Sequence, residues 1–130
     1  GINSILKNVD DQVKAMLRRE HLHGRIFFHV YGQNGVMGEL EPVNVPEGHE
    51  LCILIEAVGE TEADAETLLS ITRSTLLHYG YPGRISTAGN LAFPFSPSDV
   101  RMGAVYEFSI YHLMATRDPA MFRTHIRQIR

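Results

Sequence analysis

The chain has 130 residues, of which 44% are hydrophobic and 21% are charged, and its formal net charge is −3. This length fits one domain with a real hydrophobic core, and the acidic balance argues against a nucleic-acid-binding surface. No apolar run approaches the roughly 18 residues of a membrane span, and the N-terminus lacks the pattern of a secretory signal. The single cysteine, Cys52, excludes an intrachain disulfide, so we expect a reducing compartment and a cytoplasmic location.

Apolar residues recur at spacings of three and four from Ile2 to Leu17, which predicts an amphipathic helix. Asn3 or Ser4 is the expected N-cap, and Arg18 and Arg19 suit the negative end of the helix dipole. This helix is expected either to pack on the sheet of the same domain or to be the tail of an upstream domain. The opening glycine without an initiator methionine allows a processed fragment.

Two strands are predicted next. In the segment 25–31, Ile26, Phe28 and Val30 point to one side, as in a strand. Three glycines then follow at three-residue spacing over residues 32–38. They favour a turn or bulged hairpin connection over a phosphate-binding loop, because the Lys-Ser/Thr ending of a P-loop is absent.

A nearly continuous apolar run over residues 50–58 predicts a central strand buried on both faces. Cys52 lies in this run and is expected to be a small buried hydrophobe rather than a nucleophile.

The segment 61–79 is predicted to be a helix. Thr61 and Asp64 have the spacing of a capping box, and Gly80 is placed for the left-handed position after the last turn. Pro82 prevents the helix from continuing.

Aromatic and β-branched residues over 104–114 predict a further strand. Weaker patterns predict a short strand at 85–88 or 91–93, a helical turn at Asp118-Pro119 and an edge strand at 124–129. Together these elements predict a single α+β domain over residues 1–130. Its architecture is expected to be a two-layer sandwich, with a mainly antiparallel sheet and helices on one face, ferredoxin-like or related.

The long connection 78–99 has the composition of a ligand-binding loop. Arg84 provides a planar fork for a carboxylate or phosphate, and Thr87 and Asn90 add short polar groups. Tyr79 and Tyr81 would wall an apolar site. The alternative is that prolines and aromatics pin a structural crossover to the sheet or form a subunit contact.

Other chemistry has little support in the sequence. The seven histidines are scattered and form no HExxH pattern, so no metal site is predicted. The loop serines lack the GxSxG arrangement of a hydrolase. Catalytic residues and cofactors are left unassigned.

Three segments carry a family resemblance: GQNGVMGELEP (32–42), RSTLLHYGYPGRISTAGNLAFPFSPSD (73–99) and VYEFSIYHLM (105–114). Over roughly residues 25–114 the chain resembles the C-terminal part of acyclic terpene utilisation proteins, larger bacterial proteins associated with breakdown of branched terpenoid acids. In that family a large α/β region precedes these segments. The resemblance therefore implies a C-terminal domain or fragment.

Two functions remain open on this basis. In the first, the chain completes or oligomerises a larger catabolic enzyme, with an upstream α/β domain or a second copy as its partner. Alternatively, the 78–99 loop binds a small molecule of the carboxylate, phosphate or acyl-CoA type. Neither a nucleic acid nor a membrane is an expected partner.

Overall fold

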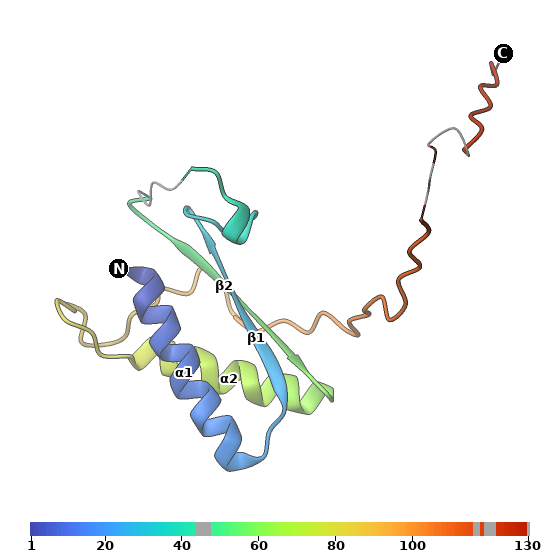
Figure 1. The fold of residues 1–130 in the computed structure, drawn as a ribbon. Helices are drawn as coiled ribbons and strands as arrows, with labels where there is room; N and C mark the ends of the chain where they lie inside the picture. Colours follow the sequence, from blue (N-terminus) through green and yellow to red (C-terminus); the bar gives the residue numbers. More distant parts are fainter. Residues whose placement is uncertain (44–47, 116–117, 119–121, 130) are drawn as a thin grey trace.

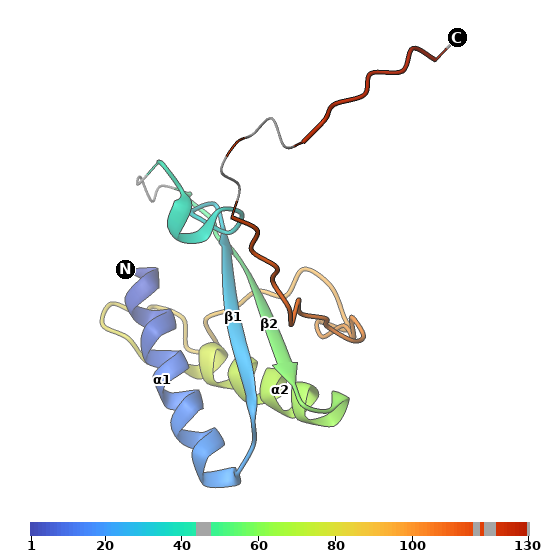
Figure 2. The same ribbon diagram turned by 45° about the vertical axis from the view of Figure 1, so that its right-hand side comes forward.

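The computed structural model describes residues 1–43, 48–115, 118 and 122–129. In chain order, these residues form α1 (Ile2–Glu20), β1 (Gly24–Tyr31), the short 3-10 helix η1 (Gly38–Leu40), β2 (Cys52–Gly59) and α2 (Glu62–His78). The two strands pair antiparallel, and both helices lie on one side of this two-stranded sheet (Figures 1 and 2). The prediction of an α+β fold with an antiparallel sheet is confirmed.

Helix α1 forms where the apolar spacing predicts it and buries one stripe of side chains. Its N-cap is Gly1 and no side chain caps it, so the prediction that Asn3 or Ser4 is the N-cap is wrong. It ends at His21, which has a left-handed φ of 54° and donates its backbone N–H to the carbonyl of Leu17. Arg18 and Arg19 lie in the last turn as predicted, where their charge suits the helix dipole.

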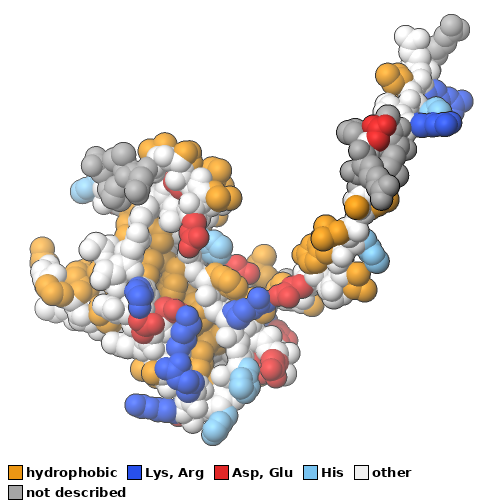
Figure 3. All heavy atoms as spheres, in the orientation of Figure 1, with side chains coloured by type: hydrophobic (Ala, Val, Ile, Leu, Met, Phe, Trp, Pro, Cys, Tyr) orange, Lys and Arg blue, Asp and Glu red, His pale blue; other side chains and the backbone are white. Residues whose placement is uncertain are grey.

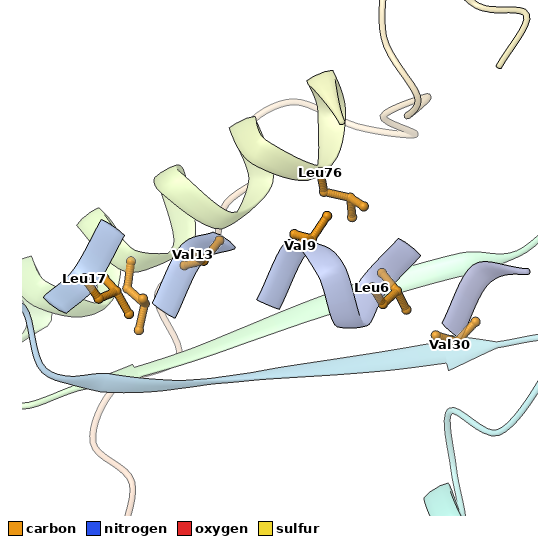
Figure 4. Packing of buried hydrophobic residues seen from close by; sticks show 7 residues of the cluster. Leu6, Val9, Val13, Leu17, Val30 and Leu76 are labelled. Atoms are coloured by element: carbon orange, nitrogen blue, oxygen red, sulfur yellow. The ribbon is translucent and has the colours of Figure 1, made fainter. Parts of the chain in front are cut away.

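The core lies between the two helices and the sheet (Figure 4). Val9 and Val13 of α1 are completely buried, and Leu68 and Leu76 of α2 are 1% and 2% exposed. Val30 closes the core from the sheet. Burying such side chains contributes about 1.5–3 kcal/mol each, so this cluster is the main source of stability for the two layers.

Strand β2 is covered on one face only. Its residues alternate between partly buried and exposed over most of its length, and Leu54 is 53% exposed. The predictions of a strand buried on both faces and of a buried Cys52 are therefore wrong, because Cys52 is exposed. The apolar run misled the prediction because periodicity does not reveal how many layers cover a sheet.

Helix α2 begins with the predicted capping box. The Asp64 backbone N–H donates to Thr61 Oγ1 at 3.1 Å, and the Thr61 backbone N–H donates to Asp64 Oδ2 at 3.2 Å. The end of the helix differs from the prediction. Gly80 does not have a positive φ, and the last turn closes at Tyr79, which has φ −58° and ψ 125°.

The predicted strand at 104–114 does not form. Residues 104–115, called the C-terminal arm below, are exposed throughout and run away from the body of the domain (Figures 1 and 3). β-propensity describes how well a residue fits a pleated, half-buried surface. A segment with high β-propensity therefore does not form a strand unless another strand lies beside it.

The weaker strand predictions are also wrong. Residues 85–88, 91–93 and 124–129 have no strand structure. The proposed helical turn at Asp118-Pro119 falls on positions outside the described residues, apart from Asp118 itself. Neither described α-helix is long and apolar enough to cross a membrane.

Candidate functional site

The connection after α2 starts with a tight turn. The Arg84 backbone N–H donates to the carbonyl of Tyr81 at 3.2 Å, and Gly83 between them has a φ of 82°. Proline followed by glycine favours such a turn, because proline fixes a negative φ and glycine accepts the positive one. Gly83 therefore serves the turn, and the turn sets the backbone position of Arg84.

Asn90 closes the end of α2. Its Nδ2 donates to the carbonyls of Leu76 at 2.8 Å and Tyr79 at 2.7 Å, and its backbone N–H donates to Leu77 at 2.9 Å. The last carbonyls of a helix have no partner within the helix. Asn90 supplies those partners from 11 to 14 residues downstream, which replaces the glycine cap predicted at position 80.

The neighbouring Gly89 allows this approach. A β-carbon at position 89 would lie 2.6 Å from Leu77 Cδ1, so the end of the Leu77 side chain would have to shift to admit it. The glycine thus brings the loop against α2 closely enough for Asn90 to reach the helix end.

The five predicted ligand-binding residues are only partly brought together. Tyr79 contacts Asn90 and accepts a 3.0 Å hydrogen bond on its hydroxyl from Asn8 of α1. Arg84 and Tyr81 are joined by the backbone turn, whereas Thr87 is exposed. Among the described residues, Arg84 has no ion pair, and its Nε is buried without a hydrogen-bond partner. Asn90 Oδ1 is likewise buried without one.

Two surface hollows lie away from Arg84. One, of about 470 Å³, lies between α1 and α2 and includes a single predicted ligand residue, Tyr79. The other, of about 310 Å³, lies at the α1–β1 junction and contains His21 and His23 beside Lys14 and Arg18. Both lack a convergent set of acidic, nucleophilic or metal-binding groups. In the described part of the chain, no three His, Cys, Asp or Glu side chains are grouped to hold a metal.

A series of ion pairs, called the seam below, lies along the chain between the 78–99 loop and the sheet. Asp99 binds Arg73 of α2 at 3.0 Å, and Arg101 binds Glu62 at 2.9 Å and Glu66 at 2.5 Å. The hydrogen bond to Glu66 raises the pKa of Arg101 further above its usual value. These pairs are exposed or half-exposed, so each contributes little stability, but together they fix the path of residues 99–101 along α2.

The seam ends at the sheet, where Glu107 of the C-terminal arm pairs with Arg25 of β1. Arg25 also lies over the ring of Phe27, 5.8 Å from its centroid. Both residues belong to the face of the sheet that the helices leave uncovered. Large apolar side chains on this face are solvent-exposed, among them Phe27 at 40%, Tyr31 at 46% and Leu54 at 53%.

On both sides of Glu107 the arm exposes a high density of apolar side chains. Their exposed fractions are 89% for Tyr106, 85% for Phe108, 69% for Ile110, 79% for Tyr111 and 98% for Leu113. Phe108 and Tyr111 contact each other, with ring centroids 6.5 Å apart. Among the described residues, the arm takes part in no backbone–backbone hydrogen bond. An exposed apolar patch of this kind marks an interaction surface.

Several of these features were not predicted from the sequence. The pairs made by Arg73, Arg101 and Arg25 join positions 26 to 82 residues apart, and no local pattern signals such pairs. The sequence contains one signal for the role of Asn90, because this asparagine lies in a glycine-rich stretch shortly after a predicted helix. We interpreted that stretch as part of a ligand-binding loop.

Comparisons of the chain with protein-family models, with curated proteins and with solved structures found no match.

Proposed function

We propose that this chain is a non-catalytic assembly domain. It completes or oligomerises a larger protein through the C-terminal arm and the uncovered sheet. The observation that carries the proposal is the arm itself, whose strand-like sequence is apolar and exposed and has no backbone partner among the described residues.

The shape of the domain supports this role. Two helices lying side by side form a layer about 20 Å wide, whereas two strands span only about 10 Å. A two-stranded sheet is also marginal by itself, and three or more strands are usual for independent stability. A further strand under the helix layer would complete a two-layer sandwich, and we propose a ferredoxin-like or related arrangement for the completed fold.

The biological setting of the proposal comes from the family resemblance. From the resemblance to the C-terminal part of acyclic terpene utilisation proteins, we propose that the domain belongs to a cytoplasmic catabolic enzyme, next to an α/β region that would carry the chemistry. The described site geometry fits a supporting role, because neither hollow gathers a set of catalytic groups.

The test is the mass of the protein in solution. Sedimentation of the chain should give an assembly larger than its monomer mass of 14.6 kDa. Phe108→Lys should weaken that assembly by at least about tenfold, because a charge would replace a buried aromatic anchor. Ser109→Lys is the matched control in the same arm and should change the assembly much less. A wild-type monomer up to about 100 µM, well above the micromolar range of ordinary interfaces, would refute the proposal that the domain oligomerises.

One observation favours a second function, a small-molecule site at the loop. Arg84 Nε and Asn90 Oδ1 are both buried without partners, and such groups are expected to find one. A carboxylate or phosphate would satisfy the arginine. Thermal-shift measurements with inorganic phosphate, terpenoid acids and acyl-CoA should show stabilisation of the wild type that Arg84→Ala removes and Arg101→Ala retains. No shift with any of these probes would exclude this function.

A further inference from the structure

The ion pair between Arg25 and Glu107 suggests how the arm can add to a sheet. Arg25 is the register partner of Val58 in β2, and Cys52, six residues before Val58, is the partner of Tyr31. Side chains two residues apart on a strand share a face, so these four residues all belong to the uncovered face.

A strand that keeps Glu107 in the row of Arg25 and Val58 has a defined orientation. Its even-numbered apolar residues, such as Phe108 and Ile110, would then face the helix layer. Running antiparallel to β2, it would bring Leu113, six residues after Glu107, opposite Cys52. The charge pair therefore sets the row, and the apolar alternation of the arm agrees with the faces that this row requires.

The dimensions also agree. Strand β2 has eight residues, and the eight residues of the arm that this register places opposite it, residues 106–113, would span about 26 Å at 3.3 Å per residue. In the described residues, the outer edge of β2 has no strand beside it. An unpaired edge presents a row of free N–H and C=O groups for an incoming strand.

In the structure the arm leaves this edge unoccupied, and beyond the contact of Glu107 with Arg25 of the same chain it points away from its own body (Figure 1). Gly103, just before the arm, has a φ of 86° and no atoms near the position of a β-carbon, which makes it a suitable hinge. An arm that projects on a hinge while its own sheet edge stays open is the arrangement from which two copies exchange strands.

The aromatic side chains of the arms would supply a large part of the area of a stable dimer. Tyr106 and Phe108 would face the helix layer and can each bury about 150–250 Å². Two exchanged arms would thus bury roughly 600–1,000 Å² through these two aromatics alone, against about 1,200–2,000 Å² for a stable interface.

We propose that the partner is a second copy of this chain, and that the two copies exchange their C-terminal arms. Each arm adds antiparallel to the β2 edge of the other copy, with Glu107 beside Val58 and in the same row as Arg25 of that copy, and with Leu113 opposite its Cys52. This inference rests on the proposed assembly function and specifies its partner and geometry.

The register provides a direct test. In the full chain, Leu113→Cys should form a disulfide with Cys52 under mild oxidation by oxidised glutathione, because directly opposed side chains on neighbouring strands approach closely enough for a disulfide. We expect a covalent dimer of about twice the 14.6 kDa chain mass, and peptide mapping should join position 113 to position 52. His112→Cys is the matched control. Its side chain would point to the opposite face, so it should give at least about fivefold less of this cross-link.

Each other outcome overturns the inference. A disulfide between positions 52 and 113 at monomer mass would show that the arm folds back onto its own β2. A dimer linked only through Cys52 to Cys52, as the wild type can form, would show that the register is wrong. The sedimentation mass of the wild type distinguishes failure of the exchange from failure of the assembly function. If the wild type assembles but the predicted cross-link does not form, only the arm exchange is refuted.

Discussion

Asn90 offers the sharpest test of how the loop and α2 depend on each other. Replacing it with alanine removes two side-chain hydrogen bonds, to the carbonyls of Leu76 and Tyr79. At about 0.5–1.5 kcal/mol each, these bonds contribute about 1–3 kcal/mol. The same substitution also removes the unpartnered Oδ1, which offsets part of the loss. We expect Asn90→Ala to lower the free energy of unfolding by about 1–2 kcal/mol.

Asn90→Asp should be worse than alanine, although its shape is closer to asparagine. A carboxylate cannot donate to the two carbonyls, and it would place a negative charge at the negative end of the α2 dipole. The dipole alone costs about 0.3–1 kcal/mol at neutral pH. The order of stability is therefore expected to be wild type, then alanine, then aspartate.

Urea unfolding followed by circular dichroism measures these differences, and an unchanged dependence on urea would show that the unfolded state is unaffected. Asn8→Ala is the control, since this exposed asparagine makes a single hydrogen bond, to the Tyr79 hydroxyl, and should cost less than about 1 kcal/mol. If both position-90 variants matched the wild type, or if aspartate were more stable than alanine, the helix-closing role of Asn90 would be refuted.

Three further predictions concern the core, a cap and a charge. Leu68→Ala should cost about 2–5 kcal/mol in urea unfolding because it opens a cavity, whereas Leu40→Ala, at a position 80% exposed, should leave the midpoint nearly unchanged. Thr61→Ala should cost about 1 kcal/mol by loss of the capping box, and an effect no larger than that of Thr67→Ala would contradict the cap. The hydrogen bond and charge of Lys7 lower the pKa of Asp11. The stabilisation that ionised Asp11 provides is therefore present above the ordinary carboxyl pKa, and it is lost as the pH falls through the folded-state pKa of Asp11. NMR titration should show this depressed pKa in the wild type and a higher pKa, closer to the ordinary carboxyl value, in Lys7→Gln.

The sequence predicted the elements whose evidence is local. The apolar spacing of α1, the alternation in β1 and the capping box of Thr61 and Asp64 each depend on residues a few positions apart. For the same reason the Pro82-Gly83 turn could be anticipated as the point where α2 cannot continue. These features are set by side-chain direction and backbone freedom, which do not require knowledge of the rest of the fold.

The candidate loop was located but its chemistry was not. Asn90 was interpreted as a ligand group, and the structure shows it closing α2. Arg84 was interpreted as an anion-binding group, and its buried Nε leaves that interpretation as a proposal. A polar side chain has the same identity whether it faces a ligand or a carbonyl, so only its surroundings separate the two roles.

The sequence alone determined the two helices, the antiparallel pair of strands and the strand-like character of residues 104–114. Only the tertiary structure decided that β2 is covered on one face, that Asn90 completes α2 and that the arm has no strand beside it among the described residues. Helix periodicity and caps are satisfied within a few residues, whereas a strand needs a neighbour supplied from elsewhere. The arm illustrates this difference, because its sequence is that of a strand and its structure depends on whether a partner edge is present.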